Sequence, residues 1–234
     1  AYELGTEISN SFAIEGEEID VEEVSHSVAV SISQENTKLV GDKYKNIAEL
    51  IIDARNTNKP LNKARLFYWH ELIFTKNKEI NNVGSWRTTT MKIVSGPLHD
   101  ITTEYIAPPP EQIEKEIQTY LKWLKDKESK SVPISIESAI AHLWFESIHP
   151  FEDGNGRIGR AICEYILNQS EIFKDAPFSL SKAIIKRRKE YYDQLKKAQS
   201  IKNQEEEIDI SEFISWFLEI TENAIDLAKE QALF

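Results

Sequence analysis

Cysteine and methionine are almost absent from this 234-residue sequence, which contains one of each. The lone cysteine, Cys163, has no second cysteine with which to form an internal disulfide bond, whereas secreted scaffolds usually carry paired cysteines. Gly/Ser linkers, internal repeats and low-complexity tracts are also missing. We therefore expect one large domain, with at most a small appendage, in a reducing, cytoplasmic setting.

Basic residues are fewer than acidic ones. The sequence has 28 Lys and Arg and 39 Asp and Glu, which gives a formal net charge of −11. This charge disfavours nucleic acid binding, which depends on neutralising phosphates with Lys and Arg. No apolar run approaches the ~18 residues of a membrane span, and the first ten residues lack the basic and apolar regions of a signal peptide. Neither nucleic acid nor a membrane is expected as a partner. Ala1 in place of Met leaves open an excised piece or a processed form.

The residues that are abundant favour a helical core. Hydrophobic residues make up 41% of the sequence and aromatic residues 10%, which suits a packed globular interior. Apolar residues recur at helical spacing in six stretches, 44–51, 61–72, 113–124, 136–144, 158–166 and 213–227. Residues 86–106 instead combine the β-favouring sequences RTTTMKIV and ITTEYI with the turn sequence SGP, and they predict a β-hairpin. The predicted fold class is all-α with one hairpin.

Residues 149–160, HPFEDGNGRIGR, connect two of the predicted helices and carry the strongest chemical signal. Gly154, Asn155 and Gly156 open the second helix, where backbone N–H groups and the positive end of the helix dipole bind anions such as phosphate. Arg157 and Arg160 follow on the first turn, three residues apart and on one side, so their guanidinium groups can hold further phosphate oxygens. The spacing suits a triphosphate.

Two other side chains of the same segment suit phosphate chemistry. Asp153 stands beside the glycines, and a single carboxylate next to phosphates is the usual protein ligand of Mg²⁺. His149 is a candidate general base, since the ordinary pKa of histidine is near 6.5. A Gly-Asn-Gly sequence alone is more often an ordinary turn. The complete string is much more specific.

The complete string is similar to the signature of the Fic family, His-Pro-Phe-x-(Asp/Glu)-Gly-Asn-Gly-Arg-x-x-Arg, with every specified position filled. The resemblance extends over about residues 40–220. It implies an N-terminal segment at 1–40 and a Fic-type helical core at 41–234, with a β-hairpin flap near 84–106. It also implies transfer of AMP from ATP to a hydroxyl side chain of a target protein, with release of diphosphate.

The resemblance gives each signature residue a role. His149 would deprotonate the incoming hydroxyl group, Asp153 would hold Mg²⁺, and Phe151 would anchor the loop in the core. The phosphates would be held at the start of the following helix, the α-phosphate by Gly154, Asn155 and Gly156 and the β- and γ-phosphates by Arg157 and Arg160.

Two further regions would complete the nucleotide site. The flap would lie over the nucleotide and offer strand edges to a target segment, through residues Ile93, Val94, Ser95 and Gly96. Residues 188–198 resemble the family's Arg-x-x-Tyr-Tyr-x-x-Leu-x-x-Ala helix, in which the first tyrosine, here Tyr191, lies against the nucleotide. The family often has Asn after that alanine. This sequence has Gln199, whose amide is carried on a longer side chain.

Residues 11–16, SFAIEG, look like the inhibitory motif (Ser/Thr)-x-x-x-Glu-(Gly/Asn) of one class of Fic proteins, which places Ser11 and Glu15 in an inhibitory helix. In that class the glutamate pairs with the second signature arginine, here Arg160, where the γ-phosphate would bind. A carboxylate can take this place because it matches a guanidinium as a phosphate oxygen does. The resemblance implies an autoinhibited enzyme, and it leaves open whether Glu15 also positions water to remove AMP.

Several alternatives stay open at the level of sequence. A Fic fold can transfer another nucleotide or phospho group, act as a de-AMPylase, or bind nucleotide as a non-catalytic regulatory module, although the intact His149 argues against the last. Self-modification and a homodimer are compatible with the family, and the target's Ser, Thr or Tyr hydroxyl is unidentified. No structural zinc site is expected from the remaining histidines, His26, His70, His99 and His142.

Overall fold

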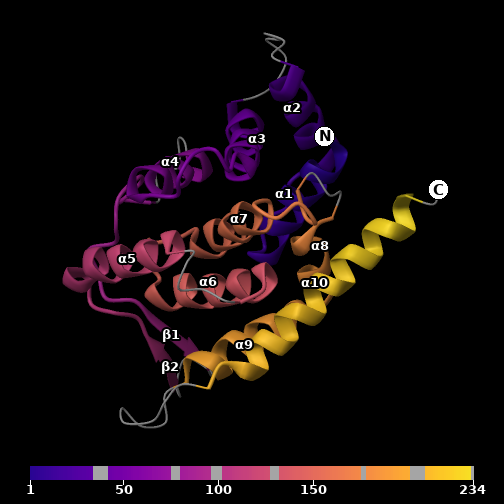
Figure 1. The fold of residues 1–234 in the computed structure, drawn as a ribbon. Helices are drawn as coiled ribbons and strands as arrows, with labels where there is room; N and C mark the ends of the chain where they lie inside the picture. Colours follow the sequence, from indigo (N-terminus) through magenta and orange to yellow (C-terminus); the bar gives the residue numbers. More distant parts are fainter. Residues whose placement is uncertain are drawn as a thin grey trace.

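The computed structural model describes residues 1–33, 42–74, 80–95, 102–126, 132–174, 178–200 and 209–232. Most of these residues are helical, which confirms the predicted all-α class (Figure 1). In chain order the elements are α1 (Tyr2–Ile14), α2 (Val21–Ser33), α3 (Asp42–Arg55), α4 (Lys63–Phe74), β1 (Lys92–Ser95), β2 (Thr102–Ile106), α5 (Pro110–Lys125), α6 (Ile134–Ile148), α7 (Asn155–Leu167), α8 (Leu180–Lys186), α9 (Arg188–Gln199) and α10 (Ser211–Ala232).

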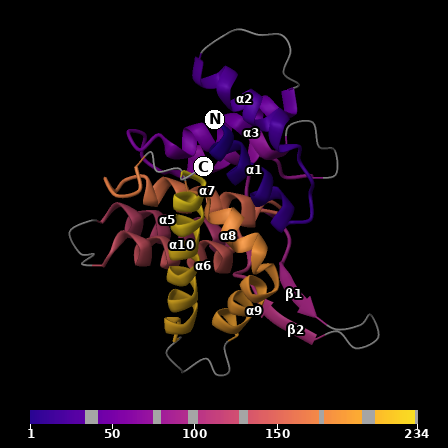
Figure 2. The ribbon, with the colours of Figure 1, turned by 90° about the vertical axis from the view of Figure 1, so that its right-hand side faces the viewer.

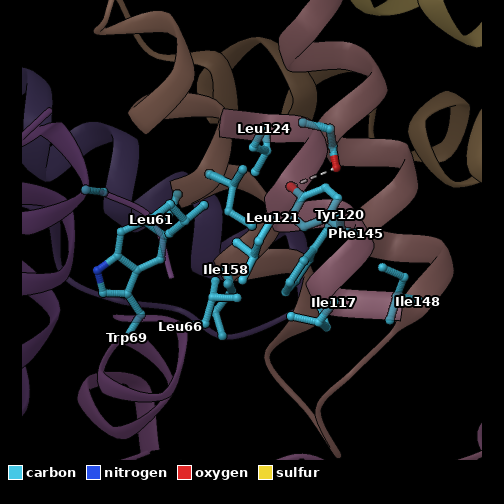
Figure 3. Packing of buried hydrophobic residues seen from close by; sticks show 14 of the residues in the cluster. Leu61, Leu66, Trp69, Ile117, Tyr120, Leu121, Leu124, Phe145, Ile148 and Ile158 are labelled. Atoms are coloured by element: carbon cyan, nitrogen blue, oxygen red, sulfur yellow. Dashed lines mark hydrogen bonds between the residues drawn. The ribbon is translucent and has the colours of Figure 1, made fainter. Parts of the chain in front are cut away.

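Helices α5, α6 and α7 lie side by side at the centre of the fold (Figure 1). Helix α5 begins at Pro110, in the first turn where a missing N–H costs nothing, and it buries the predicted apolar stripe from Ile113 to Leu124. Figure 3 shows residues of this stripe close to Phe145 of α6 and Ile158 of α7, with Trp69 of α4 farther away in the same cluster. The buried Tyr120 hydroxyl donates a hydrogen bond of 3.2 Å to the Ala141 carbonyl. This packing fixes the two helices that flank the signature segment, residues 149–160.

Helices α1 and α2 pack against each other, and α1 also packs against α8 (Figures 1 and 2). Helix α2 was not anticipated from the sequence. Gly5 permits a close approach of α1 to α2, because a Cβ atom at this position would lie 2.0 Å from Ser25 Oγ. The predicted inhibitory helix ends at Ile14, so Glu15 follows it as the C-terminal cap. Gly16, with φ of +85°, turns the chain away in the left-handed conformation that glycine favours.

The predicted hairpin is present but its strands are short. Strands β1 and β2 pair antiparallel, with Lys92 opposite Ile106 and an irregularity in the register between Ile93 and Val94. Residues 84–91 precede the strands in an irregular conformation. The hairpin extends beyond the helices next to α9 (Figure 2). Gly96 lies outside the described residues, as does His99.

Helix α10 closes the fold along α6 and α8, and its predicted apolar stripe is buried at Phe213, Phe217 and Ile220 (Figure 1). Cys163 is fully buried in α7 in the cluster that contacts this helix, and burial raises the pKa of its thiol. It is a core residue. Within the described part of the chain, none of the helices combines the length and the apolar character needed to cross a membrane.

Candidate active site

The signature segment forms a sharp connection between α6 and α7. Helix α6 ends with His149 as its C-terminal cap, because Pro150 disfavours right-handed helical geometry at the residue before it. His149 itself adopts the left-handed conformation, with φ of 48°. Gly154 precedes α7 with φ of 81°, and a Cβ atom there would lie 2.7 Å from the Phe74 ring. Only glycine meets both requirements, a positive φ and a close neighbour. The connection directs the start of α7 and His149 toward one cavity.

The loop of the segment is held from within. Phe151 is fully buried and packs against the rings of Phe67, Trp86 and His70. Its backbone N–H donates to Asn155 Oδ1 at 2.9 Å, and Asn155 Nδ2 donates to the Phe151 carbonyl at 3.0 Å. The Asn155 side chain is thus used to close the loop. On this geometry, Asn155 would contact a phosphate through its backbone N–H.

His70 of α4 packs against the loop and hydrogen-bonds to it, a role that the sequence around His70 did not indicate. Its ring stacks on Phe151 with centroids 4.3 Å apart. The Gly84 N–H donates to His70 Nδ1 at 3.0 Å, so Nε2 carries the proton and donates to the Asp153 carbonyl at 3.2 Å. Burial lowers the pKa of His70 to about 4, which keeps the ring neutral and preserves this tautomer.

Arg87 fixes the other side of the loop. This buried guanidinium donates 2.7 Å and 2.6 Å hydrogen bonds to the carbonyls of His149 and Pro108, and it also donates to the Thr89 carbonyl at 2.7 Å. Arg87 thus connects the segment that leads into the hairpin with His149, the candidate general base. The backbone of His149 therefore cannot move independently of the segment that leads into β1.

His149 is poised to accept a proton. Its Nδ1 lies 3.3 Å from the Glu146 carbonyl, which assigns the proton to Nδ1 and leaves the Nε2 lone pair free. Burial lowers the pKa of His149 below its ordinary value, while the bond to the Glu146 carbonyl opposes this shift. The ring is therefore neutral near pH 7, as a general base requires.

Both signature arginines are buried, and both are engaged by residues at the end of α1. Arg160 Nη2 lies 2.9 Å from Glu15 Oε1 and donates to the Ser11 carbonyl at 2.6 Å, while its Nε donates to Ser11 Oγ at 2.9 Å. Arg157 lies 3.1 Å from Glu17 and 3.3 Å from Asp153. The rings of Phe12 and Phe74 flank its guanidinium. The sequence singled out Glu15 and Ser11, but not Glu17.

These elements enclose a cavity of about 460 Å³, a size typical of small-molecule sites. Its wall includes His149, Asp153, the start of α7 and the α9 side chains that the sequence had indicated, Tyr191 and Gln199. Glu15 also lines the cavity, next to Arg160. The start of α7, with its free N–H groups, and two arginines on its first turns can hold a chain of phosphates.

The α9 wall is built from Tyr191, Tyr192 and Gln199. The buried Tyr191 hydroxyl lies 2.9 Å from His142 Nε2, and Gln199 Nε2 donates to Ser147 Oγ at 3.3 Å. Tyr192 was given no role from the sequence. Its hydroxyl lies 3.0 Å from the Ile14 carbonyl and 3.4 Å from Glu15 Oε2. The Arg188 Nε donates to the same carbonyl at 2.6 Å. Two side chains of α9 thus hydrogen-bond to the C-terminal end of α1.

Of the carboxylates that line the cavity, Asp153 is the one beside the glycine that precedes α7. Asp153 projects into the cavity with more than half of its side chain exposed. No group of three or more His, Cys, Asp and Glu side chains among the described residues could hold a metal by itself. Mg²⁺ fits this donor set, because it keeps water and phosphate oxygens as most of its ligands. Of the predicted flap residues, Ile93, Val94 and Ser95 have a described backbone, which forms β1. Its partner strand β2 contributes Tyr105 to the cavity wall.

Comparison with known proteins places this geometry in a family context. Residues 60–167 match the Fic/DOC family. Among curated proteins, the chain is 37% identical over 73 residues to the "Probable protein adenylyltransferase" of Aquifex aeolicus, which covers 31% of this chain and 22% of that protein. It is 32% identical over 125 residues to the "Protein adenylyltransferase Fic" of Nematostella vectensis, 53% of this chain and 26% of that protein. The chain thus aligns with about a quarter of the length of these relatives.

A more distant relative and the solved structures extend the comparison. The "Uridine 5'-monophosphate transferase" of Xanthomonas campestris is 22% identical over 157 residues, 64% of this chain and 28% of that protein. A Fic family protein of Desulfovibrio desulfuricans superposes with a TM-score of 0.71 at 24% identity, covering 99% of this chain and 66% of that one. A Fic domain protein of Bacteroides thetaiotaomicron gives 0.67 at 17% identity, covering 98% and 87%. The fold is shared with both.

Proposed function

We propose that this chain, whose residues 60–167 form a domain of the Fic/DOC family, is a protein adenylyltransferase that moves AMP from ATP to a hydroxyl side chain of a target protein. The observation that carries the proposal is that His149 and the start of α7 line one cavity. Arg157 and Arg160 lie behind its wall, in contact with the lining residues Asp153 and Glu15. The two curated relatives named adenylyltransferases support it.

The residues divide the reaction between them. His149 Nε2 would take the proton of the target hydroxyl, whose oxygen then attacks the α-phosphorus of ATP. The bond between the α-phosphorus and its bridging oxygen breaks, and diphosphate leaves with the electron pair. The backbone N–H groups of Asn155 and Gly156, at the positive end of α7, would stabilise the charge on the α-phosphate.

The leaving group would be held by the arginines. Arg157 and Arg160 lie on the same side of α7 and can take the β- and γ-phosphates once the acids on them are withdrawn. Asp153 would hold Mg²⁺, which supplies charge neutralisation at the phosphates when it is bound. The edge of the hairpin beside the cavity would bind an extended segment of the target by strand addition.

We further propose that the enzyme is autoinhibited by Glu15. Its carboxylate lies 2.9 Å from Arg160 Nη2, which also donates to the Ser11 carbonyl, while Arg160 Nε donates to Ser11 Oγ. The γ-phosphate would need the same nitrogens, so ATP could enter only in a pose that misplaces the α-phosphorus. Self-modification, a homodimer and a cytoplasmic setting, the last inferred from the lone Cys163, are also part of the proposal.

A second activity has one observation in its favour. Glu15 lines the cavity with 29% of its side chain exposed, so its carboxylate could orient water against an AMP-modified hydroxyl and make the protein a de-AMPylase. A third, transfer of UMP, is favoured by the relative from Xanthomonas campestris.

Transfer of label from α-³²P-ATP with Mg²⁺ tests the proposal. The parent, Glu15→Gly and Glu15→Gly/His149→Ala proteins are compared with and without cell lysate, and α-³²P-UTP is used in parallel. Label on protein only with Glu15→Gly and ATP would establish AMP transfer and inhibition. Label from UTP alone would redirect the function to UMP transfer. No label from either nucleotide, together with release of AMP from a modified protein, would favour the de-AMPylase.

A further inference from the structure

Glu146 is a buried acid that the proposed mechanism does not yet use. It lies in the last turn of α6, three residues before His149, with only 8% of its side chain exposed, and it contributes to the cavity wall. Its Oε2 lies 3.9 Å from His149 Nδ1, the nitrogen opposite the one that would accept the substrate proton. An acid is expensive to bury without a full set of hydrogen bonds, so this one needs a physical account.

The surroundings of Glu146 come from four helices. His142 lies one turn earlier on α6, Arg160 reaches in from α7, Tyr191 from α9, and Glu15 from the end of α1. Glu146 Oε1 has no hydrogen-bond partner among the described residues, and neither does His142 Nδ1. Both atoms lie over Gly159, since a Cβ atom there would be 2.9 Å from the first and 3.0 Å from the second.

We propose that Glu146 is a positioning residue for His149, with its carboxylate placed to stabilise the imidazolium that forms when Nε2 takes the proton of the target hydroxyl. The geometry supports this, because the Glu146 carbonyl already orients Nδ1–H at 3.3 Å and the carboxylate stands next to the same atom. The inference rests on the proposed function, in which His149 is the base. No proton is moved beyond Nε2, because the carboxylate acts by its charge.

The same geometry couples Glu146 to the inhibitory contact. The pKa of Glu146 is raised to about 8, first by burial and then by the negative charge of Glu15, while Arg160 opposes the shift. When Glu15 leaves Arg160, the repulsion falls, so Glu146 ionises at lower pH. In the nucleotide-free protein, release of the inhibitory contact would therefore favour a charged carboxylate beside His149.

Glu146→Gln tests the inference, because it keeps the shape and removes the charge. In a Glu15→Gly background we expect kcat to fall about tenfold with KM for ATP nearly unchanged, and the acidic limb of the rate profile to move down by roughly one pH unit. Glu137→Gln is the matched control, a buried glutamate in the first turn of the same helix. Loss of ATP binding with unaltered pH dependence would show a structural role and overturn the inference.

An NMR titration gives a readout that does not depend on turnover. The pKa of His149, followed through its ring resonances in the Glu15→Gly protein, should fall when Glu146 is replaced by Gln and stay unchanged with Glu137→Gln. If the substituted chain does not fold, the unaltered protein serves, since its His149 signals should show a second inflection near pH 8, where Glu146 ionises. No such inflection would overturn the inference. A shifted His149 without any AMP transfer would mean that only the proposed function had failed.

Discussion

The carboxylate of Glu17 lies 3.1 Å from Arg157 Nη1, two residues along the chain from the carboxylate that occupies Arg160. The turn after α1 thus places one acid on each of the two signature arginines. Arg157 is 5% exposed, so its side chain offers few directions of approach other than the one that Glu17 uses. Release of Glu15 alone leaves the first arginine still paired.

Glu17→Gln is therefore expected to add to the effect of Glu15→Gly. Glu17 is partly exposed, and such pairs contribute up to about 1 kcal/mol, so KM for ATP should fall by at most about fivefold relative to Glu15→Gly alone. Glu18→Gln is the matched control, because Glu18 is an exposed acid at the next position. Equal ATP affinities in the Glu17 and Glu18 variants, measured by steady-state kinetics and calorimetry, would show that Glu17 does not compete with the nucleotide.

Glu7 is expected to anchor the inhibitory helix. Its buried carboxylate accepts hydrogen bonds from Ser179 Oγ at 2.7 Å and from the Ser181 N–H at 2.9 Å, at the start of α8, and it also accepts from Ser181 Oγ. Glu7→Ala would leave these donors unpaired and weaken the docking of α1 by about 1–3 kcal/mol. Basal AMP transfer and amide exchange in residues 2–14 should both rise.

The control for Glu7 is Glu3→Ala, which removes an acid from the same helix at a less buried position. It should change neither measurement. A Glu7→Ala protein with parental exchange rates in α1 would contradict the anchoring role, whatever its activity.

Arg87→Lys is expected to slow the reaction without weakening nucleotide binding. A lysine keeps the charge but cannot reach the carbonyls of His149, Thr89 and Pro108 together. We expect kcat to fall roughly tenfold in the Glu15→Gly background, with KM for ATP within a factor of two, because misplacement of a general base acts on the chemical step. Arg187→Lys, at a partly exposed arginine on α9's N-terminal side, serves as control. A matching drop in both variants would rule out a specific effect at His149.

Stability should decrease with acidification because of His70. The pKa of His70 is about 4 in the folded protein and near the ordinary 6.5 in the unfolded chain. Between these pH values the unfolded chain therefore binds a proton at His70 that the folded protein does not bind. The free energy of unfolding is therefore expected to fall progressively between pH 6.5 and pH 4, by roughly 2–3 kcal/mol from this group. Urea denaturation at pH 7.5 and pH 5 measures the loss.

The variants compared for this prediction are His70→Asn and His26→Asn. The first should be less stable at neutral pH but less sensitive to acid, while the second changes an exposed histidine on α2 and should keep the parental dependence. A parental pH dependence in His70→Asn would assign the acid sensitivity to other groups.

The sequence predicted the parts of this molecule that local chemistry determines. The apolar stripes of α5 and α10 are buried as expected, and Pro150 and Gly154 shape the loop as their backbone preferences require. Contacts between distant segments could not be read from periodicity. The pairing of Glu15 with Arg160 entered through a resemblance, and that of Glu17 with Arg157 was missed, because nothing local distinguishes one acid in a charged turn from the next.

Other features depended on tertiary packing in the same way. Asn155 was expected to face the α-phosphate, yet its amide bonds both polar groups of the Phe151 backbone, a use that only the closed loop reveals. Glu146 has no sequence signal beyond its distance of three residues from His149, and its burial follows from the packing of α6 against α7. Helix α2 was not predicted, although its buried residues Val24, Ser27 and Val28 recur at helical spacing.

The carboxylate on Arg160 belongs to the same chain as the arginine, and under the proposed inhibition this covalent connection would set the terms of competition with ATP. A separate inhibitor is lost by dilution, whereas a tethered one keeps an effective concentration that protein concentration does not alter. The activity per protein molecule should then depend on the nucleotide concentration and on whatever weakens the docking of α1, and not on the protein concentration. A change in the cellular amount of this protein would therefore leave the inhibition of each molecule unchanged.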